Sequence, residues 1–395
     1  MLRATNVVKG KLLNLWVVFE AIRIHGPIPR TGIAELTGLS KQATSDLVDE
    51  LFSLGFLREE KSEEKRVGKP PKPITVNPEG ASTIGFHINS DRASALVMNL
   101  AGEALHRETF TLRDVEAVSV SQVLAETAQR LMVHVVPDRS NFLGIGVATP
   151  GPFGVEGISP PRMPNWDGLA LQRQLRVDTG LPVSLANDGQ CAVTAEWRFG
   201  QIAKRLSNFI YVYLGDGLGT GIMMGGSTFG GANGNAGEFG HMIVVPGGHR
   251  CICGKKGCLE TYVSGDSLLR FLADHGSTIK RLDDLAGHLS ADHALVSAWL
   301  EEAVEPLRQG LNTLENLFDP ETIMLGGDAP GWLIDALLDR VQPLYSSVSG
   351  LERALPRLSK SELGSDAVLR GAAVLPLLAM LNPHYQQLGI RREMQ

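Results

Sequence analysis

Four side chains of the kinds that bind transition metals lie within 18 residues near the middle of the chain. His241, Cys251, Cys253 and Cys258 follow the spacing H-x9-C-x-C-x4-C. Zinc in proteins is bound tetrahedrally by Cys thiolates and His nitrogens, and a Cys3His set fills all four positions. Because no position stays open for a reacting water, the pattern predicts one structural Zn2+ per chain. The alternative is a reduced, metal-free loop with reactive thiols.

The elements before this cluster begin with a helical segment of the kind found in DNA-binding modules. Apolar residues recur at helical spacing until Gly26 and Pro27, which end the first helix. Ser40 is a helix cap. Three helices and a two-stranded wing predict a winged helix-turn-helix over residues 1–75. The predicted helices cover 7–24, 30–36 and 40–55, and the extended segments cover 56–60 and 71–77.

The third helix of such a module enters the major groove, and the wing reaches phosphates or the minor groove. Residues 1–80 carry a net charge of +2, from 12 Lys/Arg and 10 Asp/Glu, so the rest of the chain carries −8. We therefore expect a double-stranded DNA operator as partner, although a protein-interaction module is the alternative. The candidate DNA contacts are Lys41, Gln42, Thr44 and Ser45 on the helix and Lys65, Arg66 and Lys69 in the wing.

Composition narrows the class of protein. The chain has 395 residues, of which 43% are hydrophobic and 20% charged, as in ordinary globular proteins. No apolar run of about 18 residues predicts a membrane span, and the N-terminus lacks the features of a signal peptide. We therefore expect a cytoplasmic protein without a membrane partner. Four cysteines in so long a chain do not indicate a fold held together by disulfides. Cys191 lies far from the other three and is predicted to be a small buried apolar residue.

From Ser82 onward the pattern changes to alternating strands and helices, after a short linker at 76–80. A helix is predicted over 119–135. The order strand–strand–strand–helix–strand occurs twice, which indicates two α/β lobes with a cleft between them. The predicted strands cover 82–88, 92–100, 142–148, 182–187, 208–215, 221–226, 241–245 and 322–327.

These motifs resemble those of the ROK family (repressors, open reading frames and kinases). The resemblance extends over nearly all of the chain, and its most specific segments are 238–241, 251–260, 186–188 and 149–151. It implies a two-lobed actin-like ATPase fold of sugar kinases, assembled as a homodimer or homotetramer. The N-terminal extension is similar to that of the repressor branch, whose members include regulators of N-acetylglucosamine and xylose metabolism. The implied lobes are 81–187, completed by helices at about 365–395, and 188–364, with the zinc loop and an oligomerisation surface.

The resemblance also implies where a sugar effector binds. Carboxylates accept hydrogen bonds from sugar hydroxyls, and Asn and His can both donate and accept. His241 then has two roles, since one ring nitrogen binds metal while the other faces the sugar. Trp166 either offers an apolar face to the sugar ring or simply packs. The implied sugar ligands are Asn165, Asn187, Asp188, Glu238, His241 and Glu260.

A kinase of this family also needs a base and a phosphate site. Asp188 occupies the position of the base. The family's Asp-x-Gly-Gly-Thr loop corresponds to residues 87–91, where His87 replaces the acid and both glycines are lost. In the second glycine loop, 215–219, Asp216 replaces a Thr, and an unpaired carboxylate there repels a nucleotide.

Two departures from the kinase pattern predict a degenerate kinase, not an enzyme, in which Asp188 is a vestigial base. The sequence therefore predicts a transcriptional regulator of carbohydrate-metabolism genes, more specifically a repressor, controlled by a sugar or sugar phosphate. The first alternative is an active ATP-dependent sugar kinase with an attached DNA-binding domain. The second is a constitutive DNA-binding protein whose body only dimerises.

Overall fold

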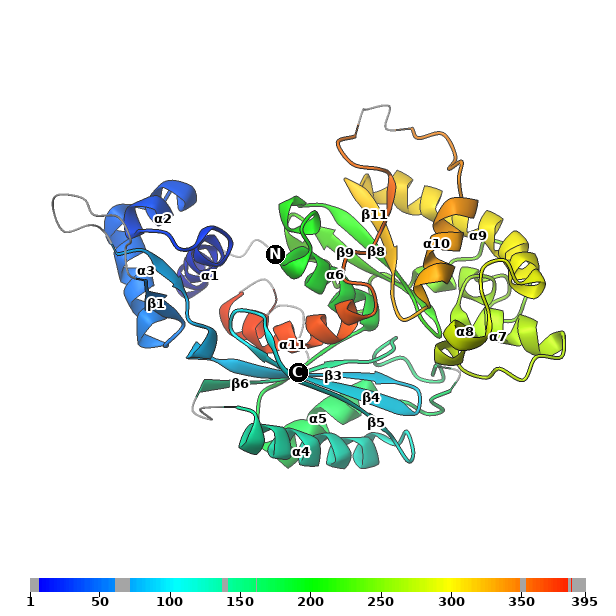
Figure 1. Cartoon of the computed structure of the whole chain (residues 1–395), viewed down its shortest axis with the longest axis horizontal. Helices are drawn as coiled ribbons and strands as arrows, with labels where there is room; N and C mark the ends of the chain where they lie inside the picture. The colour runs from blue at the N-terminus through cyan, green and yellow to red at the C-terminus, as the bar shows by residue number, and fades with distance from the viewer. Residues whose placement is uncertain are drawn as a thin grey trace.

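The computed structural model describes residues 7–60, 72–136, 141–160, 162–348, 353–382 and 385 of the chain. These residues form a small helical head and two α/β lobes. In Figure 1 the head lies at the left, the first lobe at the bottom and the second lobe at the right. The sequence-based expectation of a two-lobed body behind an N-terminal module is confirmed.

The head has the elements of a winged helix-turn-helix. Ser40 caps the third helix by accepting a hydrogen bond from the Ala43 amide (3.2 Å). Gly38 ends the second helix in the left-handed conformation that favours glycine. Val76, predicted as linker, is instead the last residue of the wing, because it pairs with Leu57. The elements are α1 (Val7–His25), α2 (Arg30–Thr37), α3 (Lys41–Ser53), β1 (Leu57–Glu59) and β2 (Ile74–Val76).

The first lobe is a five-stranded sheet in the order β5-β4-β3-β6-β7. One face is covered by α4 (Ala117–His134) and α5 (Gly168–Thr179), and the other by α11 (Asp366–Leu381), as Figure 1 shows. In the described residues, the C-terminal helix α11 thus packs on this lobe. The strands are β3 (Ser82–Asn89), β4 (Arg92–Asn99), β5 (Ala104–Thr111), β6 (Phe142–Ala148) and β7 (Val183–Ala186).

The second lobe repeats the same plan, with the strand order β10-β9-β8-β11-β12. Residues 241–245, predicted as a strand, are not one: only Ile243 forms an isolated bridge, to Cys258, because the segment folds around the cysteine cluster. The elements are α6 (Asp188–Phe199), β8 (Phe209–Leu214), β9 (Leu218–Met224), β10 (Ser227–Thr228), α7 (Gly265–Asp274), α8 (Leu282–His288), α9 (Ala294–Phe318), β11 (Thr322–Gly326), α10 (Gly331–Arg340) and β12 (Leu358–Lys360).

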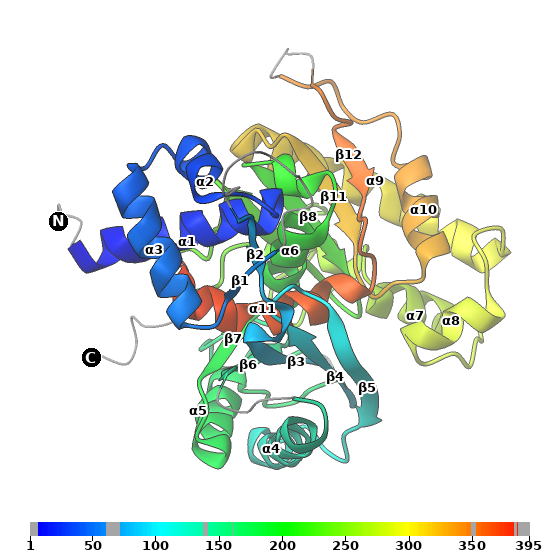
Figure 2. The same ribbon diagram turned by 60° about the vertical axis from the view of Figure 1, so that its left-hand side comes forward.

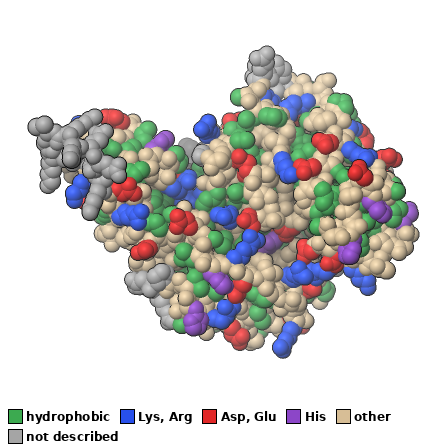
Figure 3. All heavy atoms as spheres, viewed as in Figure 1, with side chains coloured by type: hydrophobic (Ala, Val, Ile, Leu, Met, Phe, Trp, Pro, Cys, Tyr) green, Lys and Arg blue, Asp and Glu red, His purple; other side chains and the backbone are tan. Residues whose placement is uncertain are grey.

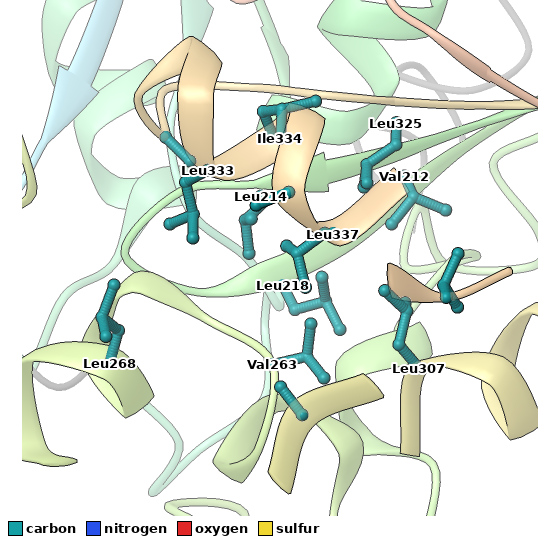
Figure 4. Close-up of a cluster of buried hydrophobic side chains, with 14 of the residues drawn as sticks. Val212, Leu214, Leu218, Val263, Leu268, Leu307, Leu325, Leu333, Ile334 and Leu337 are labelled. Carbon is teal, nitrogen blue, oxygen red and sulfur yellow. The ribbon is translucent and has the colours of Figure 1, made fainter. Parts of the chain in front are cut away.

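The second lobe has its own aliphatic core between the sheet and its helices. Figure 4 shows side chains of β8 and β11 meeting those of α9 and α10. Leu214, Leu333 and Leu307 are fully buried there. Burial of such side chains holds the strand ends of this lobe in fixed positions, at about 1.5–3 kcal/mol for each large aliphatic residue.

The head and the body share one hydrophobic core. Phe19 and Ile22 of α1 belong to the same buried cluster as Ala373 and Leu377 of α11. Figures 1 and 2 both show α1 lying beside α11. The head is therefore packed on the body by apolar contact, in addition to the covalent connection at β2.

The surface carries both signs of charge. Figure 3 shows Lys and Arg interspersed with Asp and Glu across the face seen in Figure 1. Among the described residues, no helix is both long and apolar enough to cross a lipid bilayer.

Candidate functional site

The cleft is built from the carboxyl ends of parallel strands in both lobes. β3 ends at Asn89, β7 is followed by Asn187 and Asp188, β8 is followed by Asp216, and β11 is followed by Asp328. In open α/β sheets ligands bind outside these strand ends, where loops bring polar groups together. The topology thus gathers residues that are up to 239 positions apart, such as Asn89 and Asp328.

A pocket of about 850 Å³, including its open mouth, lies between the lobes. Its polar lining suits a small polar ligand such as a monosaccharide. Five of the six residues predicted to bind sugar line it, and they come from both lobes. These five are Asn187, Asp188, Glu238, His241 and Glu260.

Asn187 and Asp188 are held at the start of α6. The Asn187 side chain caps this helix by accepting a hydrogen bond from the Gln190 amide (2.8 Å). Asp188 follows in the first turn and is only 8% exposed. A carboxylate is favoured at a helix N-terminus, because the unpaired amides there carry partial positive charge. Asp188 is thus fixed as a hydrogen-bond acceptor for a ligand hydroxyl.

Two further carboxylates face the pocket from the second lobe. Burial and the neighbouring Glu260 raise the pKa of Glu238 to about 7, although Lys255 opposes this. Burial also raises the pKa of Glu260, whose Oε2 accepts a hydrogen bond from the Leu218 amide (3.3 Å). With a pKa of about 7, the Glu238 carboxyl group can donate as well as accept hydrogen bonds near neutral pH, which suits a polyhydroxyl ligand.

The predicted metal ligands converge. One ligand atom from each of His241, Cys251, Cys253 and Cys258 lies within 4.8 Å of all the others. The sulfur atoms of Cys253 and Cys258 are 3.6 Å apart, which is too far for a disulfide but matches two thiolates on one tetrahedral zinc. The donor set therefore fits a metal ion with four protein ligands. His249 is exposed, contacts the Tyr262 ring at a tilt of 48° and is no member of the cluster.

His241 belongs to both the cluster and the pocket. Its Nδ1 lies 3.4 Å from the Cys251 sulfur, while its Nε2 lies 3.8 Å from Glu238 Oε2. One ring nitrogen thus faces the cysteines and the other faces the pocket, as the sequence analysis expected. A metal bound at Nδ1 fixes the ring and leaves Nε2–H as a hydrogen-bond donor.

Two residues of the first lobe do not take the predicted positions. Asn165 is exposed, adopts a left-handed backbone conformation (φ 57°) and is not among the pocket residues. Trp166 is buried in the core of the first lobe beneath α4 and α5, so of its two predicted roles packing is the observed one. Arg162, three residues before Asn165, lines the pocket instead.

The phosphate side of the cleft is occupied by side chains that bind across the lobes. Four consecutive residues at the β3–β4 hairpin each contact the second lobe. The contacts are Asn89 Nδ2 to Asp328 Oδ2 (3.3 Å), Ser90 Oγ to Asp216 Oδ2 (2.8 Å), Asp91 to Arg281 Nη1 (2.7 and 2.8 Å) and Arg92 Nη1 to Asp283 Oδ2 (2.8 Å). We call residues 89–92 the bridging hairpin.

The bridging hairpin divides the cleft into two cavities. A second cavity of about 910 Å³, including its mouth, lies on its other side. Asn89, Ser90, Arg162 and Asp216 line both cavities and so form the wall between them. Phosphoryl transfer requires the phosphate and the accepting hydroxyl to lie in line and in contact. A wall of hydrogen-bonded side chains between the cavities opposes that contact.

His87 links Asp188 to this wall. Its Nε2 lies 3.4 Å from Asp188 Oδ1 and 3.9 Å from Asp328 Oδ2, and the side chain is 8% exposed. Burial alone lowers the pKa of His87, but Asp328 and Asp188 outweigh burial and raise it to about 9. Tyr213 donates a hydrogen bond to the same Asp328 oxygen (3.0 Å). A protonated His87 thus stands between two carboxylates.

The sequence of the two-lobed body identifies the family to which the chain belongs. The sequence model of the ROK family matches residues 83–378. This chain belongs to the ROK family. Its fold is the two-lobed actin-like sugar-kinase fold expected from the sequence, preceded by the winged helix-turn-helix.

Relatives within the ROK family differ in how much of the chain they match. A xylose repressor of Caldicellulosiruptor bescii is 27% identical, over 95% of this chain and 98% of the repressor. A ROK family transcriptional regulator, described as a homologue of the E. coli MLC protein, has a crystal structure with a TM-score of 0.73 and 25% identity, covering 96% of this chain and 98% of that one. A glucokinase of Streptomyces coelicolor is 29% identical over 314 residues, which cover 74% of this chain and 96% of the kinase. The regulators match head and body, whereas the kinase matches a length close to that of the body.

The residues that differ from the ROK kinase loops have defined conformations and partners in the structure. Ser90 keeps a left-handed conformation (φ 54°) that favours glycine, although it bears a side chain. Asp91 does not rescue a metal site, because Arg281 holds it by two hydrogen bonds. Asp216 is paired with Ser90 and lies 3.9 Å from Arg162, so its charge is partly compensated.

The residues predicted to contact DNA are only partly accessible. Lys41 and Gln42 are exposed at the start of α3, as expected. Thr44 was expected to be exposed but is fully buried, because it lies on the inner face of α3 that carries Leu47 and Val48. Ser45 is half-buried and accepts a hydrogen bond from Arg30 (2.7 Å). Three wing residues lie outside the described residues, namely Lys65, Arg66 and Lys69.

Sequence reasoning missed several residues of the cleft, which lie in loops or, for Asp266, in the first turn of α7. Arg162 and Asp266 line the pocket and lie 3.7 Å apart. Asn235 ties the lobes together on the sugar side, since its amide exchanges two hydrogen bonds with the Phe153 backbone (2.8 and 2.9 Å). Isolated polar residues in loops carry no periodic signal, so only the folded chain reveals them.

Proposed function

We propose that this chain is a transcriptional repressor whose affinity for a DNA operator changes when a sugar or sugar phosphate binds in the cleft. One observation carries the proposal. The sugar side keeps an open pocket with Asp188, Glu238 and Glu260, while the bridging hairpin separates this pocket from the cavity on the phosphate side. The head shares a core with this body, which suits a receptor that reports occupancy to DNA. The similarity to repressors along nearly the whole chain supports the same reading.

In this proposal the pocket residues bind the sugar and do not activate it. Asp188 accepts a hydroxyl proton in a hydrogen bond, and its negative charge is compensated by His87. Glu238, Glu260 and Asn187 complete the ring of donors and acceptors. Zn2+, bound by His241 and the three cysteines, fixes the loop between Glu238 and Glu260. We extend the proposal to a cytoplasmic homodimer or homotetramer, because one winged helix-turn-helix reads only a few base pairs.

The sugar changes DNA binding only by preferring one of two conformations. The contacts of the bridging hairpin exist only when the lobes are close together, so they stabilise a closed body. A sugar that bridges Asn187, which follows β7 of the first lobe, and Glu238 of the second lobe shifts this equilibrium. The change in lobe position then alters the spacing of the two heads in a dimer.

The test begins with in-vitro selection of a binding duplex from a random library, followed by fluorescence anisotropy titrations. The titrations are repeated with saturating D-xylose, D-glucose, N-acetyl-D-glucosamine and their phosphates. We expect one sugar to change the operator affinity by about 5- to 150-fold, as is typical of allosteric coupling. No selected duplex, or an operator affinity that no sugar alters, contradicts the proposal.

The alternative is an active sugar kinase with an attached DNA-binding domain. Asp188 at the position of the base and the 29% identity to a glucokinase favour it. A coupled assay of ATP turnover over the same sugars decides between the two. Sugar-dependent turnover that the Asp188→Asn substitution abolishes establishes the kinase, whereas turnover at the level of the sugar-free control supports the receptor.

A further inference from the structure

The helix α6 connects the sugar pocket to the head. Asp188 in its first turn lines the pocket, and Arg198 in its last turn is buried against the head with 3% exposure. Ten residues separate them, which corresponds to about 15 Å along a helix. The two ends of one secondary-structure element thus lie in the two functional regions of the molecule. Figure 1 shows α6 between the second lobe and α11, with α1 nearby.

The contact at the head end is a buried network of charged groups. Arg198 Nη1 donates to Glu20 Oε1 (2.7 Å), and Arg23 Nη1 donates to the Arg198 carbonyl (3.1 Å). The Arg198 guanidinium also lies 5.8 Å from the centroid of the Trp16 ring. Burial alone raises the pKa of Glu20, but Arg198 and Arg23 outweigh burial and lower it. All three partners of Arg198 lie on α1, so the network joins one helix of the head to one helix of the body.

The energy of such a network depends more steeply on atomic positions than the energy of the surrounding apolar contacts does. Apolar packing tolerates small sliding movements, whereas a buried ion pair needs short distances and good alignment to offset the loss of solvation. A displacement of Arg198 by an ångström or two therefore changes the energy of the contact with α1. Because α1 shares its core with Val48 and Leu51 of α3, α1 and the recognition helix move together.

The body of α6 is too closely packed to absorb a movement at one end. Residues 188–196 are all buried. A Cβ atom added to Gly221 of β9 lies 1.9 Å from the Gly189 carbonyl oxygen, and one added to Gly371 of α11 lies 2.0 Å from that of Cys191. The helix backbone is thus in direct contact with backbone on two sides. Close-packed interiors of this kind transmit displacements and do not deform locally.

We infer that α6 is the element that carries the sugar signal to the DNA-binding head, and that Arg198–Glu20 is the contact at which the head receives it. The inference rests on the proposed function, since it requires a sugar at Asp188. A sugar bound to the first turn shifts the helix as a unit with lobe closure. The last turn then moves Arg198 relative to Glu20, which reorients α1 and with it α3.

The test replaces the buried pair by apolar residues of similar size, in the double variant Glu20→Leu/Arg198→Met. Replacing both residues leaves neither Glu20 nor Arg198 as a buried unpaired charge. Arg23, which also donates to Glu20 Oε2 (2.7 Å), keeps its hydrogen bond to the backbone carbonyl of residue 198. The control is Glu315→Leu/Arg357→Met, which removes a partly buried ion pair of the second lobe, with Arg357 Nε 2.8 Å from Glu315 Oε1. Sugar affinity is measured by calorimetry, and operator affinity by anisotropy with and without the sugar found to be active. The protein is the full chain throughout.

We expect the double variant to bind the sugar and the operator each within about threefold of wild type, while the sugar-induced change in operator affinity falls from about 5–150-fold to less than twofold. The control keeps the full change. A double variant that responds to sugar like wild type overturns the inference. If wild-type protein itself binds operator equally with and without sugar, the proposed function fails, and this inference fails with it.

Hydrogen exchange on the wild-type protein tests the same point without any substitution. Sugar binding is expected to change the protection of the α1 amides around residues 16–23 in addition to those at the pocket. If operator affinity responds to sugar while α1 exchange does not change, the signal travels by another route and the inference is wrong. This measurement remains decisive even if the double variant does not fold.

Discussion

The two cavities of the cleft share four wall residues but differ in what their polar side chains do. On the sugar side, Asp188, Glu238 and Glu260 face an open pocket and keep acceptor capacity for a ligand. On the phosphate side, each of the four residues of the bridging hairpin already has a partner in the other lobe. The same strand ends thus form a binding site in one half and an interlobe contact in the other.

Under the proposed function, this difference is the structural basis on which a kinase-like cleft keeps recognition without transfer. A phosphate loop must leave bare backbone exposed for its ligand. Here Asn89 and Ser90 add side chains at the position of that loop, and these side chains satisfy carboxylates of the second lobe. Contacts within the protein replace the contacts that a nucleotide makes. The comparison between the halves is open to four experimental tests.

The largest effect is expected from breaking the sugar half at Asp188. The Asp188→Asn substitution removes a charged acceptor of sugar hydroxyls, and hydrogen bonds to charged groups contribute about 1.5–3 kcal/mol. Calorimetry should show sugar affinity weakened by about 10- to 100-fold, with operator affinity in the absence of sugar preserved. Asp335→Asn, an exposed carboxylate on α10, serves as the control. Unchanged sugar affinity in the Asp188 variant means that the sugar does not bind where the pocket residues indicate.

The second effect concerns the metal that braces the sugar half. Cys253→Ser removes one of four ligands, so elemental analysis should find well below one zinc per chain, against one in wild type. The melting temperature should fall by at least about 5 °C, and sugar affinity should fall with it because His241 loses its fixed orientation. The matched control is Cys191→Ser, a buried cysteine outside the cluster. A wild-type protein that contains no zinc when purified without chelator refutes the metal assignment.

The third prediction concerns the positive charge of His87 on the phosphate side, which the pH dependence of stability tests. His87 has a pKa of about 9 in the fold, against about 6.5 for a histidine in an unfolded chain. Its folded pKa is raised, so its stabilising contribution is complete below about pH 6.5 and is lost as pH rises through about 9. Unfolding titrations should show about 2–3 kcal/mol less stability at pH 9.5 than at pH 7 from this group alone. The His87→Gln variant should lack that component, and a variant with the full wild-type pH dependence contradicts the assignment.

The smallest effect is expected from opening the wall. Asn89→Gly/Ser90→Gly removes two hydrogen bonds between the lobes, at about 1 kcal/mol each, while glycine relieves the left-handed conformation at residue 90. Chemical denaturation should show a net loss of about 1–2 kcal/mol, with sugar affinity within about twofold of wild type. A loss of sugar affinity comparable to that in the Asp188 variant shows instead that the wall belongs to the sugar site.

The parts of the fold with strong local signals could be predicted from the sequence. The head was recognised because helix caps and glycine stops mark its boundaries, as at Ser40 and Gly38. The buried strand β8 is a continuous apolar run, and β3 places Ile84, Phe86 and Ile88 at alternate positions. The edge strand β5 was missed because its residues alternate and include few apolar ones. Residues 241–245 look like a strand, but the requirements of the cysteine cluster override their β propensity.

The site could be predicted only where residues carry a specific pattern. The metal cluster converges as its spacing indicated, and the motif residues Asn187, Asp188 and Glu238 meet in one pocket. Asn165 was placed by resemblance alone, and the structure leaves it exposed outside the pocket. The contacts of the bridging hairpin could not be predicted, because their partners lie between 126 and 239 residues away in the chain.

The central claim is that sugar binding in the cleft and DNA binding by the head are coupled through one conformational equilibrium of the body. Linkage requires that the sugar and the operator change each other's affinity by the same factor. The most direct measurement is therefore the dissociation constant of the sugar on the free protein and on the operator-bound protein, by calorimetry under identical conditions. The account predicts that the two constants differ by at least about fivefold and by the factor seen for DNA. Two equal constants contradict it.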